Sequence, residues 1–296
     1  MAWPSRRQIT LAAHLHARAR RRGHATALPE IRHSSQLGLV IVNPDVAAGA
    51  LIETWQRLVS AVPGGWTRSA GGAVAAVTGV SVPTLNGVWV GEADLEAGLV
   101  AALLDQVAAT RLPYCLQARP DAAEQLIELA ATRGMTMARQ IPLMVLDDPS
   151  SLGAMLPVHG LVIRELQPAE ADHHARLAAA GFEAPVEPFL QLMTPPILAL
   201  PGVRCYIGEV DGEPATTGLG VTIGPYVAIF NVATPPAHRR RGFAAALTAR
   251  AVADGFAGGA RWAWLQSSEA GHTVYERLGF RTVSNWPCWL AVSTHP

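Results

Sequence analysis

The chain has 296 residues, a length that suits two domains of ordinary size. Half of its residues are hydrophobic, so material for a large core is present, and its 23 basic side chains balance its 23 acidic ones. A net charge of zero argues against a dedicated nucleic-acid-binding protein, because such proteins usually carry a basic face. No stretch of about 18 uncharged apolar residues occurs, so we expect no membrane-spanning segment.

The cysteines and the N-terminal segment bear on where the protein resides. Cys115, Cys205 and Cys288 lack the spacing of a metal or redox motif, and their odd number fits a reducing cytoplasm better than a disulfide framework. All three lie in apolar runs, so we interpret them as inert buried thiols. The basic, acid-poor segment 1–36 is compatible with a transit peptide, but we expect a disordered extension. The predicted location is therefore the cytoplasm.

Strand and helix patterns alternate after this extension. In the segment 46–62, Leu51, Trp55 and Leu58 recur at helical spacing, and similar patterns predict helices at 94–109 and 121–132. Apolar or β-branched runs bounded by turn residues predict strands at 71–82, 85–90, 114–118 and 141–146. A polar cluster that contains a proline then predicts a linker at 147–151.

The second part of the chain repeats this plan. The patterns predict strands at 161–165, 203–210, 215–223, 226–234, 262–266, 280–283 and 286–292, and helices at 168–180, 242–256 and 272–278. Asp211-Gly212 is the strongest hairpin signal, because the favoured two-residue turn requires positive φ angles. The segment 183–201 is rich in proline and apolar residues and is predicted to be a loop. Four tryptophans on the predicted strands are interpreted as core residues rather than an acceptor pocket: Trp262, Trp264, Trp286 and Trp289.

Local features recur between the two parts. The dipeptides Leu116-Gln117 and Leu265-Gln266 each lie near the end of a predicted strand, and each is followed by a predicted helix and then a glycine. A proline, Pro142 or Pro287, stands at the same offset after that glycine. A shared order at a shared offset indicates a tandem duplication. We therefore predict an α/β (α+β) fold with two tandem domains, each a mixed, mostly antiparallel sheet flanked by helices.

The segment 234–247 has the pattern of a phosphate-binding turn. A strand ends, two prolines follow, and a helix is predicted to begin at Gly242. A helix N-terminus presents unpaired N–H groups and a partial positive charge. Gly242 and Ala244 lack bulk, so an anion can approach the backbone, and the run Arg239-Arg240-Arg241 adds positive charge. The alternative interpretation is a solvated basic helix cap.

Two motifs resemble those of the GNAT acetyltransferase superfamily. The run Arg239-x-x-Gly242-x-Ala244, after a Val-x-Thr strand end and a proline, resembles the acetyl-coenzyme A loop of that family. The segment 268–280, with its Tyr275-x-x-x-Gly-Phe ending, resembles the next strand–helix unit. The motifs stand in the family's order and at a fitting separation. The resemblance covers residues 161–292 and implies that 155–296 is a catalytic N-acetyltransferase domain.

The resemblance also implies roles for particular residues. The strand end at 232–234 would splay from the next strand and pair with the pantetheine arm like an added strand. The N–H groups of 240–244 would hold the pyrophosphate, and Arg239 or Arg241 would contact phosphate. Tyr275 would protonate the leaving thiolate as general acid, and a strand N–H such as that of Val232 would stabilise the oxyanion. The implied coenzyme site comprises Val232, Ala233, Thr234, Arg239, Arg240, Arg241, Gly242, Phe243, Ala244 and Ser268.

The sequence departs from the family pattern in several places. Ser268 stands where the family often has Asn, and Gly271 stands where it usually has Ala. The predicted strand 226–234 contains no Glu or Asp to take a proton from the attacking amine. Other residues that remain candidates for this base, acting through water, are His272, Glu269 and His238. Alternatively, the amine arrives already partly neutral.

The first half lacks the phosphate-binding turn. Glu92, Asp94 and Glu96 stand where the Arg-x-x-Gly-x-Ala run should be, and carboxylates there would repel a pyrophosphate. We therefore predict that residues 37–150 form a degenerate GNAT-like domain. Such a domain would bind no coenzyme A and would wall the acceptor site of the other half.

These expectations combine into one predicted activity. The enzyme would transfer an acetyl group from acetyl-coenzyme A to a small-molecule or peptide amine, in a ternary complex and without a metal. It would act as a monomer, which is a pseudo-dimer, or as a homodimer, with no nucleic-acid or membrane partner. Asn231, before the splayed strand end, is a candidate for substrate contact. A non-catalytic acetyl-coenzyme A sensor is the main alternative, and a longer acyl chain or a protein or tRNA acceptor also stays open.

Overall fold

The computed structural model describes residues 41–152 and 158–291, so the predicted extension 1–36 lies outside the described residues. The strands are β1 (Trp66–Ala70), β2 (Ala73–Val77), β3 (Asn86–Val90), β4 (Tyr114–Ala118), β5 (Thr136–Leu146), β6 (Leu161–Glu165), β7 (Val203–Val210), β8 (Glu213–Ile223), β9 (Tyr226–Ala233), β10 (Trp262–Gln266) and β11 (Arg281–Ala291). The helices are α2 (Pro44–Ser60), α3 (Ala97–Ala108), α4 (Pro120–Ala123), α5 (Ile127–Thr132), α6 (Ala171–Phe182), α7 (Glu187–Leu192), α8 (Pro195–Leu198), α9 (Phe243–Ala257) and α10 (Glu269–Arg277).

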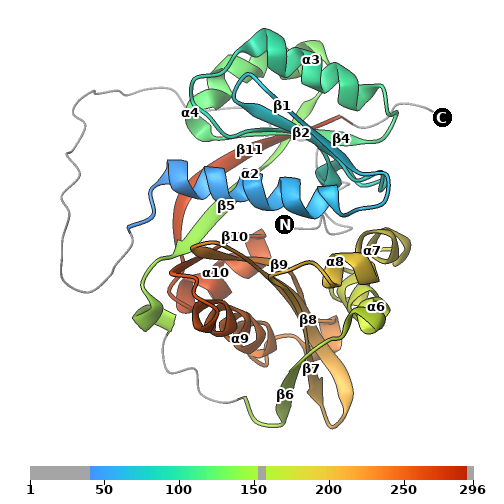
Figure 1. Cartoon of the computed structure of the whole chain (residues 1–296), viewed down its shortest axis with the longest axis vertical. Helices are drawn as coiled ribbons and strands as arrows, with labels where there is room; N and C mark the ends of the chain where they lie inside the picture. Colours follow the sequence, from blue (N-terminus) through green and yellow to red (C-terminus); the bar gives the residue numbers. More distant parts are fainter. Residues whose placement is uncertain (1–40, 153–157, 292–296) are drawn as a thin grey trace.

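All of these strands belong to one sheet, whose order is β1-β2-β3-β4-β11-β5-β10-β9-β8-β7-β6 (Figure 1). Two neighbouring pairs are parallel, β3 with β4 and β9 with β10, and the other pairs are antiparallel. In each parallel pair a helix connects the two strands, α3 in the first half and α9 in the second. The mixed, mostly antiparallel sheet flanked by helices is the predicted fold class, which is confirmed.

The two halves exchange their last strands at the centre of this sheet. β11, the last strand of the second half, lies between β4 and β5, while β5 of the first half lies between β11 and β10. β5 and β11 pair along almost their whole length, from Arg281 opposite Val145 to Leu290 opposite Thr136. Figure 1 shows these two long strands crossing the middle of the molecule. The sheet of each half is therefore continuous only through a strand of the other.

The repeated dipeptides meet at this exchange. Gln117 is the next-to-last residue of β4, and Gln266 is the last residue of β10. The buried amide of Gln266 donates a hydrogen bond to Oε1 of Gln117 at 3.2 Å. A buried amide needs such a partner, because an unsatisfied polar group in the core costs about 1–3 kcal/mol. The two residues singled out by the internal repeat thus satisfy each other across the boundary between the halves.

The helices cover both faces of the sheet. On β8, the glycines at 218 and 220 face Leu247 and Ala251 of α9, while Leu219 between them belongs to the core beneath α2 and α6. This alternation is the period-two geometry of a strand. The core on the α2 side runs continuously through both halves, whereas the other side is divided into one cluster beneath α3 and another beneath α9. Helices α2, α6, α7 and α8 therefore lie on one face, and α3, α9 and α10 lie on the other.

Helix α2 ties the first half to the second. The Tyr226 hydroxyl at the start of β9 donates to the Glu53 carboxylate of α2 at 2.9 Å, and Thr54 lies 3.2 Å from the same hydroxyl. Arg57 donates to the Pro201 carbonyl at 2.6 Å. Asn43 caps the helix by accepting from the N–H of Val46, which fixes where α2 begins. Figure 1 shows α2 lying across the middle of the molecule, between the two groups of helices.

Several predicted elements have the predicted bounds, including β4, β6, β7 and β10. Others differ. The predicted strand 71–82 is present but shorter, as β2, because Gly71 and Gly72, both with positive φ, form the turn of the hairpin β1–β2. The predicted strands 280–283 and 286–292 are one strand, β11, with register shifts between Thr282 and Ser284 and between Cys288 and Trp289. The predicted loop 183–201 contains α7 and α8, each opened by a proline in its first turn.

The sites of the cysteines and tryptophans agree with the sequence interpretation. Cys115, Cys205 and Cys288 are buried free thiols. The tryptophans on β10 and β11 are buried in the core.

Within residues 41–152 and 158–291, none of the helices combines the length and the apolar character that crossing a membrane requires.

A buried histidine on α6 predicts an acid-sensitive fold. His174 is fully buried, its Nδ1 lies 2.6 Å from the Thr217 hydroxyl, and burial lowers its pKa to about 3. Because the unfolded pKa is about 6.5, the unfolded chain binds more protons than the folded one between these values. The stability that neutral His174 contributes is present above pH of about 6.5 and is lost as the pH falls, by up to about 5 kcal/mol.

We therefore expect His174→Leu to have a flatter dependence of melting temperature on pH than the wild type between about pH 6.5 and 4. His173→Leu is the matched control, because the His173 side chain is 53% exposed. Thermal unfolding followed by circular dichroism measures the three proteins. Identical acid slopes for the wild type and His174→Leu would contradict the assignment.

Candidate active site

The parallel strands β9 and β10 open into a wedge. They pair only where Tyr226, Val227 and Ala228 face residues 262–264. Beyond Ala228 the edge of β9 that faces β10 has no strand partner among the described residues, although β9 continues to Ala233. On its other side β10 stays paired with β5 as far as Gln266. The strand end at 232–234 thus lies on a free edge, as the predicted splay requires.

A bulge in β9 lies beside this wedge. Thr217 of β8 faces Ala233, whereas Leu219 faces Phe230, so Asn231 and Val232 together face a single residue. That residue is Gly218, where a Cβ would come within 2.7 Å of a Leu247 methyl and 3.1 Å of a Val232 methyl. Asn231 has a φ of 50°, a left-handed conformation that asparagine tolerates better than most residues. The bulge redirects the strand at the wedge, and no sequence pattern indicated it.

The turn before α9 presents a row of unpaired backbone N–H groups. Arg240 and Gly242 have φ angles of 62° and 81°, so residues with positive φ alternate with residues of negative φ through the turn. Within the described part of the chain, no N–H from 240 to 245 donates a hydrogen bond; the first that does is Ala246, to the Gly242 carbonyl. α9 has 15 residues, so its N-terminus carries the partial positive charge of a full helix. The turn fits a diphosphate.

The three arginines of the turn have different surroundings. The Arg239 guanidinium donates to the Gly181 carbonyl at 2.7 Å and to the Thr234 carbonyl at 3.1 Å, and it pairs with Glu183 at 2.7 Å. It therefore holds the turn against the end of α6. Arg240 and Arg241 are exposed, and the Arg241 guanidinium lies 4.6 Å from the Phe243 ring centre. Their charges remain available to an anion at the turn.

The remaining residues of the predicted site differ in how they are exposed. The Phe243 side chain is buried in the core, so only its backbone N–H faces the turn, and Ala244 is half-buried. The Thr234 hydroxyl lies 2.9 Å from that of Thr216, which donates to the Ala233 carbonyl. Ser268 caps α10: its hydroxyl accepts from the Gly271 N–H at 3.1 Å. A role of Ser268 in binding coenzyme A remains a prediction.

Tyr275 lies on α10, which packs against the same apolar cluster as α9. Its ring is half-buried, with its centre 6.1 Å from that of Phe280, in an edge-to-face arrangement. Burial raises the pKa of Tyr275 to about 12, so the phenol stays protonated at neutral pH. A protonated phenol can donate a hydrogen bond to a sulfur or oxygen that gains negative charge.

The candidate bases are already engaged to different extents. His272 lies 3.4 Å from Glu276 through Nδ1 and 3.1 Å from the Thr282 hydroxyl through Nε2. His238, which lies just before the arginines of the turn, has a buried Nδ1 without a partner in the described residues. The described residues contain no group of three or more His, Cys, Asp or Glu side chains placed to hold a metal.

The corresponding strands of the first half form no wedge. β3 and β4 pair from Gly87 opposite Cys115 to Val90 opposite Ala118, which is the full length of β3 after its first residue. Beyond them, the Arg119 N–H donates to the Val90 carbonyl, which closes the end of the pair. The acidic residues that follow β3 thus adjoin a closed sheet, and a pantetheine arm has no free strand edge there.

Comparisons with known proteins agree with this geometry. The model of the acetyltransferase (GNAT) family matches residues 173–280. A GCN5-related N-acetyltransferase from Kribbella flavida has a similar structure, with a TM-score of 0.64 at 22% identity over 83% of this chain and 95% of the other. A comparison with curated protein sequences gives no match.

Two further solved structures share the fold. A GCN5-related N-acetyltransferase from Sphaerobacter thermophilus has a TM-score of 0.53 at 18% identity, over 82% of this chain and 84% of the other. A tandem GNAT protein from the clavulanic acid biosynthesis pathway has a TM-score of 0.52 at 16% identity, over 77% and 82% of the two chains. Residues 173–280 therefore form an acetyltransferase (GNAT) family domain, in a chain that has the fold of GCN5-related N-acetyltransferases, a tandem GNAT protein among them.

Proposed function

We propose that the protein transfers an acetyl group from acetyl-coenzyme A to an amine, by direct attack in a ternary complex. The observation that carries this proposal is the proximity of two features on consecutive elements. The free edge of β9 begins beyond Ala228, and the unpaired N–H groups of 240–245 follow directly after that strand. One extended ligand with a diphosphate at one end and amide groups along its arm would satisfy both.

The residues of the chain would hold acetyl-coenzyme A in three ways. The N–H groups of 240–245 donate to the diphosphate, and Arg240 and Arg241 add charge. The backbone of 232–234 pairs with the amides of the pantetheine arm. Arg239 keeps the turn in place through its bonds to Gly181 and Glu183. The bound ligand supplies the activated acetyl group, and no metal takes part.

The wedge also suggests which groups assist the transfer. A backbone N–H on the free edge of β9, such as that of Val232, would donate to the oxygen that becomes negative during attack. Tyr275 would donate to the departing sulfur, and its raised pKa keeps its proton in place over the working pH range.

We further propose that the enzyme is cytoplasmic and that its two halves have different roles. Residues 155–296 contain the wedge and the turn and would form the catalytic domain. Residues 37–150 contain the closed β3–β4 pair, so they would bind no coenzyme A and would wall the acceptor site through α2. The acceptor would be a small-molecule or peptide amine, and the pseudo-dimeric chain would act as a monomer or homodimer.

The role of Tyr275 gives a prediction with a matched control. Tyr275→Phe removes only the hydroxyl, so we expect about a hundredfold lower turnover with a nearly unchanged Kd for acetyl-coenzyme A. Tyr114→Phe, a similar change on the half-buried Tyr114 of β4, should leave both unchanged. Thiol release and calorimetry measure the two quantities. A large loss of affinity in Tyr275→Phe would instead indicate a structural role.

Thiol release from acetyl-coenzyme A over a panel of amines tests the activity itself. Transfer to at least one amine, together with calorimetric binding of acetyl-coenzyme A, is the expected result. Binding without transfer to any amine would favour a sensor, which the absence of an acidic residue on β9 also fits. Absence of binding would overturn the proposal.

A further inference from the structure

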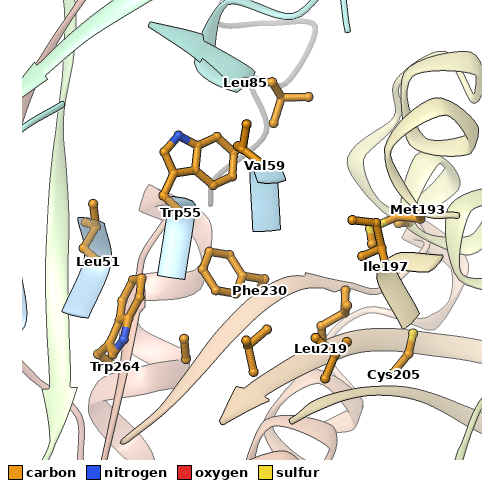
Figure 2. Packing of buried hydrophobic residues seen from close by; sticks show 14 of the residues in the cluster. Leu51, Trp55, Val59, Leu85, Met193, Ile197, Cys205, Leu219, Phe230 and Trp264 are labelled. Atoms are coloured by element: carbon orange, nitrogen blue, oxygen red, sulfur yellow. The ribbon is translucent and has the colours of Figure 1, made fainter. Parts of the chain in front are cut away.

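A cavity lies between the two halves on the face of the sheet opposite to α9. Its walls come from α2 of the first half, from β8 and β9, and from α7 and the residues that follow it. Figure 2 shows Trp55 and Val59 of α2 above Phe230 of β9, with Leu219, Met193 and Ile197 across from them. Phe230 and Asn231 also line the cavity, and they follow Ala228, where the wedge opens. The cavity therefore adjoins the point at which a thioester in the wedge would become accessible from this face.

The walls of this cavity are almost wholly apolar. Among the residues that line it, polar side-chain atoms occur only on Thr78, Asn231 and the indole nitrogen of Trp55. The Thr78 hydroxyl is engaged, since it lies 3.3 Å from Oδ1 of Asn86 and accepts from the Val80 N–H at 3.2 Å. The Asn231 side chain makes only a weak contact, from Nδ2 to the Met193 sulfur at 3.4 Å. Asn231 is therefore available to a ligand, as is the Trp55 indole N–H, which is buried without a partner among the described residues.

The charged side chains on the surrounding elements are directed elsewhere. On α2, Glu53 is bonded to the Tyr226 hydroxyl and Arg57 to the Pro201 carbonyl. On α7, Glu187 is exposed at the first residue, and β9 carries no ionisable residue except Tyr226 at its start. None of these residues lines the cavity. An ammonium group that entered would lose its hydration without gaining a carboxylate, which is strongly unfavourable.

We infer that the acceptor is a small apolar amine that is uncharged at neutral pH, such as an aromatic amine. This inference rests on the proposed function, and it accounts for the absence of an acidic residue on β9. An alkyl ammonium must lose a proton to a base before it attacks, whereas an amine of low basicity arrives neutral. The cavity encloses about 40 Å³, which is less than an aromatic ring occupies. Binding would therefore require the cavity to widen, for which Met193, a flexible unbranched side chain, would change rotamer.

The bonds and the proton of the transfer are all accounted for without a basic residue. The lone pair of the neutral amine nitrogen forms the new bond to the thioester carbonyl carbon, and the carbon–sulfur bond breaks with its electron pair passing to sulfur. The proton that the nitrogen releases neutralises the thiolate, so the products are an amide and free coenzyme A. The Asn231 amide would orient the amine, and the Tyr275 hydroxyl would stabilise the departing sulfur.

Calorimetry on the full chain with two probes of similar size tests the inference without any acetyl-coenzyme A. Aniline is uncharged at neutral pH, whereas cyclohexylamine is largely protonated, as a lysine side chain with a pKa of about 10.4 is. We expect the aniline Kd to be constant between about pH 7 and 9 and the apparent cyclohexylamine Kd to fall about tenfold for each pH unit. A cyclohexylamine Kd that is tighter than that of aniline at pH 7, or independent of pH, would overturn the inference.

Asn231→Asp places the missing carboxylate in the cavity with almost no change in shape, and aspartate also tolerates a φ of 50°. We expect this variant to bind cyclohexylammonium at pH 7 at least tenfold more tightly than the wild type and aniline more weakly. Asn285→Asp, the same change at an exposed position on β11, should have neither effect. An unchanged preference in a folded Asn231→Asp protein would show that the amines bind elsewhere and would contradict the inference.

These outcomes are separable from the proposed function. If acetyl-coenzyme A binds and is turned over only with charged amines, the proposed function stands and the inference about the acceptor fails. If neutral amines bind in the cavity but acetyl-coenzyme A does not bind, the acetyl transfer itself fails while the selectivity of the cavity stands.

Discussion

Replacing Gly242 by Asp is expected to abolish the binding of acetyl-coenzyme A. The substitution places a carboxylate where the diphosphate would lie, and like charges about 4 Å apart near a protein surface repel by roughly 4 kcal/mol. That energy corresponds to a Kd about a thousandfold weaker. A Cβ at Gly242 would lie 3.5 Å from its nearest neighbour, a Val158 methyl, so a steric clash does not explain the loss.

A matched glycine separates the charge from backbone strain. Gly212, in the turn between β7 and β8, has a φ of 82°, close to the 81° of Gly242, and a Cβ there would meet no atom within 4 Å. Gly212→Asp therefore imposes the same left-handed aspartate far from the wedge, at a cost of about 1 kcal/mol in stability. Calorimetry should find wild-type affinity in Gly212→Asp. An affinity of Gly242→Asp equal to that of the wild type would show that the diphosphate does not bind at this turn.

Separating the halves is expected to leave neither of them folded. Residues 151–296 would lack β5, which lies between β10 and β11, and residues 1–150 would lack β11, which lies between β4 and β5. Each fragment would thus leave its last strand, β11 or β5, without any partner, and would expose one edge of β10 or β4. It would also expose the apolar surface that α2 or β9 covers in the whole chain. Solubility and circular dichroism of the separate fragments measure the effect.

Co-expression of the two fragments provides the control. If the exchanged strands hold the halves together, the fragments should assemble into a soluble complex, because every strand again has its partners. A soluble, fully active fragment 151–296 on its own would contradict both the exchange and the proposal that the first half walls the acceptor site.

Local sequence patterns predicted most single elements, but they did not predict which strands are neighbours. Strands such as β7 have alternating or continuous apolar runs with clear turn residues at both ends, so their bounds follow from local chemistry. The exchange of β5 with β11 depends on pairing between residues about 140 positions apart in the chain, such as Val145 and Arg281, and periodicity contains no information about that pairing. The glycines at 71 and 72 were assigned to a strand because their small neighbours continue the apolar run.

In the candidate site, too, the sequence predicted the local features but not those that depend on tertiary contacts. The turn before α9 was identifiable because Gly242 and Ala244 are needed for an anion to approach the backbone. The engagement of Arg239 with Glu183, the capping role of Ser268 and the bulge at Asn231 all depend on tertiary contacts. The cavity under α2 joins residues of both halves, so its apolar character became visible only when the fold placed Trp55 beside Phe230 (Figure 2).

A crystal structure of the chain with acetyl-coenzyme A tests the proposed function most directly. The account predicts the diphosphate within hydrogen-bonding distance of the N–H groups of 240–245, with the pantetheine arm along the edge of β9 beyond Ala228 and the thioester facing the cavity. A nucleotide bound elsewhere, for example beside α3, or a pantetheine arm that does not enter between β9 and β10, would contradict it.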